Sequence, residues 1–168
     1  MRRTVSWIVL VLTALLLQSV VFGRLELAGA KPELIYLLAI LSAYLEGPAS
    51  GALTGFFGGM AQDFLLNQPK GITALTLTLV GYAVGSLRQY ILTPSPLLPV
   101  LLVAGATAVG VLFNGMFLYL IGRFDAGFAF LVRISVLSAV YNAILTPLAF
   151  PIVRWLIEGS RPRKVFRW

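Results

Sequence analysis

One ionisable residue stands at the end of a glycine series in the third apolar segment of this chain. Four glycines and an aspartate occupy every fourth position, as Gly47, Gly51, Gly55, Gly59 and Asp63. A carboxylate at membrane depth costs about 2.5–3.5 kcal/mol at the centre of a helix, so it indicates a polar function or a dedicated partner. Glycines four apart let a second helix approach backbone to backbone, which is how helices associate in lipid. The series predicts a packing surface that ends at a polar site.

Two interpretations of this series stay open at the level of sequence. In the first, the glycines pack against another helix of the same chain, and Asp63 caps or hydrogen-bonds the loop 67–71. In the second, the far end of the series lines a ligand pocket or contacts a partner, with Asp63 in a polar role. A proton relay is less favoured, because the other ionisable candidates, Glu33, Glu46 and Arg133, lie at apparent segment ends.

The other polar residues inside apolar segments are amides. Gln18, Asn114 and Asn142 cannot exchange protons near neutral pH, and hydrogen bonds between membrane helices contribute about 0.6 kcal/mol on average. Asn114 and Asn142 are candidate polar-site residues, although interhelical hydrogen bonding is the favoured interpretation. Gly81 and Gly85 add a second close-approach pair, four residues apart.

Composition places the chain among integral membrane proteins. Apolar residues make up 59% and charged residues 11% of the chain, with a mean hydropathy of +0.93, whereas soluble domains average about 45–50% apolar and about 25% charged. The lack of cysteine and histidine excludes zinc sites built on them, thiol catalysis and histidine acid–base chemistry. Most enzyme classes are excluded with them, and we expect no cofactor. The net charge of +7 comes from residues beside apolar segments and in one tail, which favours membrane topology over nucleic-acid binding.

Six apolar segments approach the roughly 20 residues that a membrane-spanning helix needs. They predict an all-α membrane protein with one domain over residues 1–168, and their approximate bounds are 4–22, 33–45, 48–66, 72–87, 97–121 and 132–157. The second apolar run rises only about 18 Å as a helix, so this segment is short, re-entrant or extended through Pro32. Pro147 and Pro151 predict a kink in the last segment.

Basic residues flank both ends of the apolar region. Arg2 and Arg3 precede the first segment, and a tail over residues 160–168 carries Arg161, Arg163, Lys164 and Arg167. The positive-inside rule places both ends in the cytoplasm, which agrees with an even number of crossings. The tail either fixes this orientation or contacts anionic lipid or a cytosolic partner. A cleaved signal peptide is disfavoured, because the run from Val5 to Phe22 is long for a signal core.

Residues 31–88 carry a series of short motifs in a defined order. A Pro-Glu-Leu opening at residues 32–34 and a break at 46–48 precede a G-A-L-x-G-F-x-x-G run at 51–59. Gln62-Asp63, the loop glycine Gly71 and an L-V-G-Y-x-x-G motif at 79–85 follow. In these motifs and their order, the chain resembles the bacterial rod shape-determining MreD family. The chain length, the six segments, and Asn142 with Pro147 in the last of them also agree.

The resemblance implies a non-enzymatic inner-membrane scaffold of the machinery that elongates the side wall of rod-shaped bacteria and regulates peptidoglycan synthesis and cell shape. Its expected partner is MreC, through the membrane helix and adjoining region, and indirectly MreB and the elongation transpeptidase and glycosyltransferase. The face that binds MreC and self-association as a homodimer are left open. The family is also similar to the six-helix substrate-binding components of energy-coupling-factor transporters. The alternative function is therefore a transporter-like subunit that binds a small molecule or lipid in an outward-facing pocket near Asp63.

Overall fold

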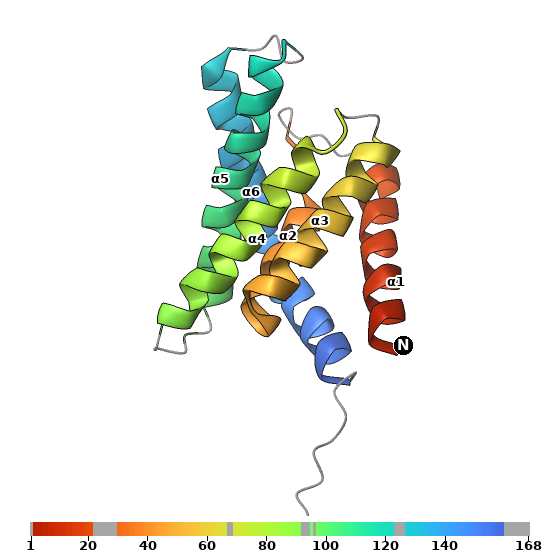
Figure 1. The fold of residues 1–168 in the computed structure, drawn as a ribbon. Helices are drawn as coiled ribbons and strands as arrows, with labels where there is room; N and C mark the ends of the chain where they lie inside the picture. Colours follow the sequence, from red (N-terminus) through yellow and green to blue (C-terminus); the bar gives the residue numbers. More distant parts are fainter. Residues whose placement is uncertain are drawn as a thin grey trace, which may run out of the picture.

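The chain is an all-helical bundle in the computed structural model. The structure describes residues 2–21, 30–66, 69–91, 95, 97–122 and 127–159. Its helices are α1 (Arg2–Leu16), a π-helical turn η1 (Leu17–Val21), α2 (Leu34–Glu46), α3 (Pro48–Leu65), α4 (Ile72–Tyr90), α5 (Leu98–Leu120) and α6 (Phe128–Gly159). The start of α1 and the end of α6 lie at the same end of the bundle (Figure 1).

The six α-helices correspond to the six apolar segments of the sequence, with shifted ends. The helix α4 continues to Tyr90 and α6 begins at Phe128, both beyond the expected bounds. Hydropathy marks the apolar part of a helix, whereas the backbone hydrogen bonds continue into flanking residues of any polarity. The helix α6 stays continuous through Pro147 and Pro151. The kink expected there stays a prediction.

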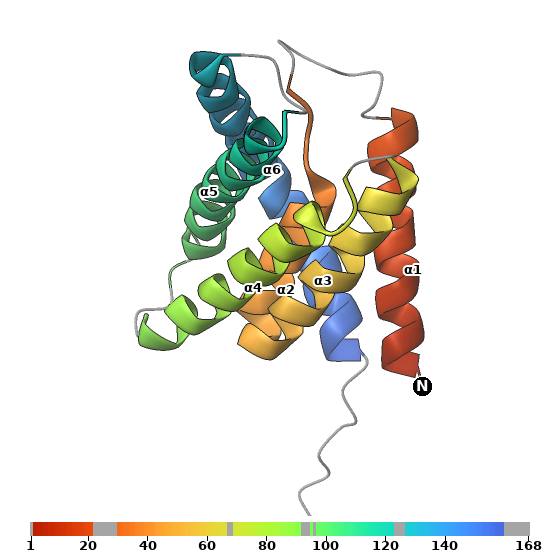
Figure 2. The same cartoon turned by 45° about the horizontal axis from the view of Figure 1, so that its top comes forward.

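The short helix α2 forms the centre of the bundle. Its residues from Ile35 to Ala43 are all buried, and both views show α3, α4 and α6 around it (Figures 1 and 2). A helix that is apolar on every side is a core helix, because no face of it is adapted to water. An extended segment, Ala30–Glu33, leads into α2 (Figure 2). The second apolar segment, which is short for a membrane-spanning helix, is thus a central helix preceded by an extended lead-in.

The outer surface of the bundle is strongly apolar. Large apolar side chains on α1, α3, α5 and α6 are exposed, among them Leu16, Phe57, Leu101, Ile144 and Trp155. Within the described residues, α5 and most of α6 are long and apolar enough to cross a membrane, with mean hydropathies of 2.0 and 1.8. Apolar patches this extensive on a soluble monomer are rare. The surface therefore agrees with the membrane class that composition predicts.

Candidate functional site

The glycine series of α3 lies directly against α4. A Cβ added to Gly55 would collide with the carbonyl group of Leu77, and one added to Gly59 would lie 2.5 Å from the Cα of Ala74. At Gly51 the added atom would lie 2.7 Å from a carbonyl oxygen of α4. These neighbours are backbone atoms, which cannot move aside as a flexible side chain can. The two helices pack at a separation that only glycine permits along this line.

The helix α4 contributes the complementary glycines. A Cβ on Gly81 would meet the carbonyl group of Gly51, and one on Gly85 would meet the backbone of Pro48. Gly47 differs, because a Cβ there would enter open space. Its φ of 102° lies in the left-handed region that favours glycine, and it joins α2 to the proline-initiated start of α3. The described geometry is therefore that of packing within the chain, the first of the two interpretations above.

Asp63 caps the start of α4 from the end of α3. Its side chain is fully buried, and its Oδ2 accepts hydrogen bonds from the backbone N–H groups of Gly71 at 2.8 Å and Ala74 at 3.4 Å. These groups belong to the helix start, where four N–H groups have no partner within the helix. The negative charge also lies at the positive end of the helix dipole. The carboxylate thus joins α3 to α4 beyond the glycine contacts.

Replacement of Asp63 should separate this capping role from a ligand-binding role. We expect Asp63→Ala to lower the free energy of unfolding by about 2 kcal/mol, because the first turn of α4 loses its acceptor. We expect Asp63→Asn to cost less, because an amide oxygen still accepts from Gly71. The measurement is thermal unfolding of the detergent-purified protein. Wild-type stability of the alanine variant would contradict the capping role.

A second polar cluster surrounds Glu33, directly before α2. The Oε2 of Glu33 accepts hydrogen bonds from the Nε2 atoms of Gln18 at 2.8 Å and Gln62 at 3.2 Å. Gln18 lies in η1 and Gln62 on α3, and only 2% and 6% of their respective surfaces are exposed. Short π-helical turns are rare and occur frequently at functional sites. We call Glu33, Gln18 and Gln62 the Glu33 cluster.

Asn142 on α6 holds the backbone of Glu33 in place. Its Oδ1 accepts from the N–H group of Glu33 at 3.1 Å, and its Nδ2 donates to the carbonyl oxygen of Glu33 at 3.0 Å. Nδ2 also donates to the Oγ1 of Thr107 on α5 at 3.1 Å. Asn142 is fully buried. One amide therefore satisfies both backbone groups of Glu33 and joins α6, α5 and the lead-in to α2.

Asn114 forms a hydrogen bond between two other helices. Its Nδ2 donates to the Oγ1 of Thr73 at 3.2 Å, which joins α5 to the start of α4. No hydrogen bond among the described residues links Asp63, Asn114 and Asn142 to one another directly. Asp63, Asn114 and Asn142, which the sequence indicated as candidate polar-site residues, thus stabilise three separate contacts between helices. For Glu33, the sequence indicated only a position at a segment end. The basic residues of the tail lie outside the described residues.

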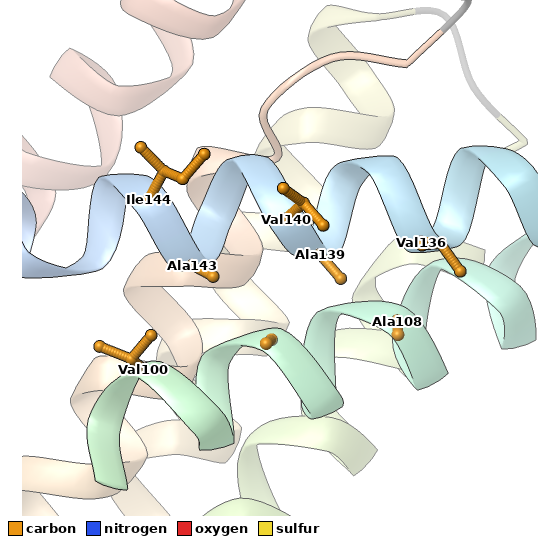
Figure 3. Close-up of a pocket in the computed structure, with 8 residues that line it drawn as sticks. Val100, Ala108, Val136, Ala139, Val140, Ala143 and Ile144 are labelled. Atoms are coloured by element: carbon orange, nitrogen blue, oxygen red, sulfur yellow. The ribbon is translucent and has the colours of Figure 1, made fainter. Parts of the chain in front are cut away.

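An open apolar groove runs between α5 and α6 (Figure 3). Its volume is about 420 Å³, and only alanine, valine and isoleucine line it: Val100, Ala104, Ala108, Val136, Ala139, Val140, Ala143 and Ile144. Each helix contributes two alanines four residues apart. Ala139 and Ala143 point from α6 toward α5 in Figure 3. This spacing of small residues permits close helix approach in lipid.

These features define a class of protein: a helical membrane protein whose central polar side chains hold its own helices together. Residues 1–157 match the family described as rod shape-determining protein MreD, and the chain belongs to that family. The family is non-enzymatic and acts in the MreBCD shape machinery. The resemblance seen in the motifs of residues 31–88 is thereby confirmed over nearly the full chain. No curated protein and no solved structure matches the chain, and the likeness to energy-coupling-factor components stays an expectation.

Proposed function

We propose that this chain is a multi-pass inner-membrane scaffold subunit of the cell-wall elongation machinery and that it binds the membrane helix and adjoining region of MreC. Family membership supports the assignment to the shape machinery. Through MreC the scaffold links indirectly to MreB and to the elongation transpeptidase and glycosyltransferase. Both ends face the cytoplasm in this proposal, and the basic tail contacts anionic lipid, where each basic residue adds about 1 kcal/mol of attraction.

The groove between α5 and α6 is the surface that we assign to MreC. In lipid, helices gain little from burying apolar area and depend on close packing, so a partner helix requires a surface of small residues. The glycine series does not offer that surface, because α4 already covers Gly51, Gly55 and Gly59. Of the groove alanines, Ala139 is buried, whereas the other three are partly exposed. Val140 and Ile144 beside them are exposed. This open groove is the observation that carries the proposal.

Filling the groove should weaken the complex without disturbing the bundle. We expect Ala108→Leu combined with Ala143→Leu to reduce co-purification of MreC in detergent at least tenfold, a loss of about 1.4 kcal/mol in binding free energy. Ala83→Leu is the matched control, because Ala83 is an exposed alanine on α4 outside the groove. Thermal unfolding of each variant establishes that the bundle is intact. Wild-type recovery of MreC with the groove filled would overturn this assignment.

A further inference from the structure

A second open groove lies between the first and the last helices of the bundle. Its volume is about 430 Å³, and residues of α1, η1, α2 and α6 line it. Its most deeply buried lining residues are Leu38 on α2 and Val153 on α6, with 5% and 2% of their surfaces exposed. Val9 and Ile152, which also line it, are exposed. This groove, which we call the α1–α6 groove, therefore reaches from the surface to the central helix.

The helix α1 contributes little buried surface to the bundle. Among the side chains described on it, Leu15 is buried in the apolar core, whereas Val9, Leu12 and Leu16 are exposed. The helix is held further by Gln18, in the following turn η1, which donates a hydrogen bond to Glu33. An occupant of the α1–α6 groove would add contacts between α1 and the rest of the bundle.

The chemistry of the α1–α6 groove is that of a hydrocarbon. Among the described residues that line it, Thr13 has the only polar side chain. The Oγ1 of Thr13 donates to the carbonyl oxygen of Val9, one turn earlier on α1, at 2.7 Å. A polar ligand that left water for this groove would lose its hydrogen bonds without replacement. The occupant is therefore apolar where it contacts the groove.

The shape of the lining favours a flexible chain over a helix. A partner helix in lipid needs small residues that let the backbones approach closely. The α1–α6 groove has only one alanine on each wall, Ala14 and Ala149, among the described residues that line it, and the others except Thr13 are valine, leucine or isoleucine. The α5–α6 groove, by contrast, has two alanines four residues apart on each wall. An acyl chain can follow the irregular surface between large side chains, whereas a helix cannot.

Positive charge lies on the groove side of α1, two turns before the groove. Arg2 and Arg3 precede the lining residues Val9 and Leu10 by seven positions each. Seven residues are two helical turns less about 20°, so each arginine shares a side of α1 with the lining residue that follows it. From Val9 to Leu17 the groove rises about 12 Å along the helix, close to the half-thickness of about 15 Å of the hydrocarbon core. Charge and length together match a lipid of one leaflet whose headgroup is negative.

We propose that the α1–α6 groove binds an acyl chain of an anionic phospholipid whose headgroup lies at the end of the bundle where α1 begins. The end of α6 lies at this same end (Figure 1). The lipid fills the space between α1 and α6 and contacts α2 through Leu38. This site differs from the contact assigned to the basic tail, because it holds a single lipid between helices.

The test is lipid retention by the detergent-purified full chain, measured by native mass spectrometry after addition of equal amounts of phosphatidylglycerol and phosphatidylethanolamine. We expect one phosphatidylglycerol molecule per chain, retained about tenfold more than phosphatidylethanolamine. Ala149→Phe places a large side chain in the groove and should reduce this retention about tenfold. Ala83→Phe is the matched control, because Ala83 is an exposed alanine on α4 outside the groove. The control should retain lipid like the wild type.

A second pair of variants tests the headgroup. Arg2→Gln combined with Arg3→Gln should keep a lipid in the groove and lose the preference for phosphatidylglycerol, because the acyl contacts are unchanged. Arg133→Gln is the control, because Arg133 is an exposed arginine near the other end of α6. Its variant should keep the preference. The measurement is made in detergent, so a changed orientation in the membrane does not affect it.

Several outcomes would overturn the proposal. Wild-type protein that retains no lipid would exclude the site, and equal retention of the two lipids would exclude an anionic headgroup; neither result depends on a variant that folds. Normal retention by Ala149→Phe, or by Ala14→Leu from the opposite wall, would exclude this location. Loss of MreC with lipid retention unchanged would assign the groove to a protein. The two grooves share no residue, so failure here is distinct from failure of the MreC assignment.

Discussion

Gly55→Leu is expected to prevent the chain from forming its bundle. The first atom of any side chain at this position would overlap the carbonyl group of Leu77, so α3 and α4 would have to separate along their length. Overpacking costs typically about 1–3 kcal/mol, and more where backbone must shift, which is a large fraction of the stability of a domain. We expect aggregated or rapidly unfolding protein, measured by size-exclusion chromatography and thermal unfolding in detergent.

Gly105→Leu provides the matched control for this prediction. Gly105 is an exposed helical glycine on α5, and a Cβ there would meet no atom within 4 Å. The same chemical change should therefore leave folding close to wild type. A Gly55→Leu variant that folds normally but loses MreC would contradict our assignment. That result would favour the interpretation in which the glycine series faces a partner.

Asn142→Ala is expected to produce the second large effect. The change leaves the N–H group of Glu33 and the hydroxyl of Thr107 without the partner that Asn142 provides, whereas the carbonyl oxygen of Glu33 keeps its hydrogen bond from the N–H group of Leu37. Each unsatisfied buried group costs about 1–3 kcal/mol, so a total loss of about 2 kcal/mol or more in stability is expected. Thermal unfolding measures this loss, and faster proteolysis of the Ala30–Glu33 segment would show that the lead-in to α2 has been released.

Asn114→Ala is the comparison for Asn142→Ala. Asn114 is half-buried, and its described side-chain hydrogen bond is the one to Thr73. We expect a loss of about 1 kcal/mol, clearly smaller than at Asn142. Equal losses at the two positions would contradict the view that Asn142 is the central junction.

The contacts of the glycine series and of Asp63 could be predicted from local sequence patterns. The four-residue period predicted a helix–helix contact, and the loop after Asp63 was one of the predicted places for its hydrogen bonds. Both features lie within one hairpin, since α3 and α4 are neighbours in the chain. A short connection makes antiparallel contact between successive helices the simplest arrangement. Sequence reasoning therefore comes close to the observed geometry there.

The contacts of Glu33 could not be predicted from local sequence patterns. Its partners are Gln18, Gln62 and Asn142, the last 109 positions away. No spacing rule connects residues that distant. The sequence placed it only at a segment end, whereas in the structure it is half-buried and hydrogen-bonded to residues of η1, α3 and α6. The sequence also left open whether the second segment is short, re-entrant or extended through Pro32. The structure shows a short helix, α2, buried at the centre of the bundle.

The sequence by itself determined the membrane class, the six apolar segments and the family, because composition, hydropathy and motif order depend only on the chain. The tertiary structure decided that α4 covers the glycine series, that the lead-in to α2 is held by Asn142, and that the α5–α6 groove stays open. The physical reason is that lipid is as apolar as the interior of the bundle. An apolar pattern therefore does not reveal which face of a membrane helix points inward, and only the packing of the other helices does.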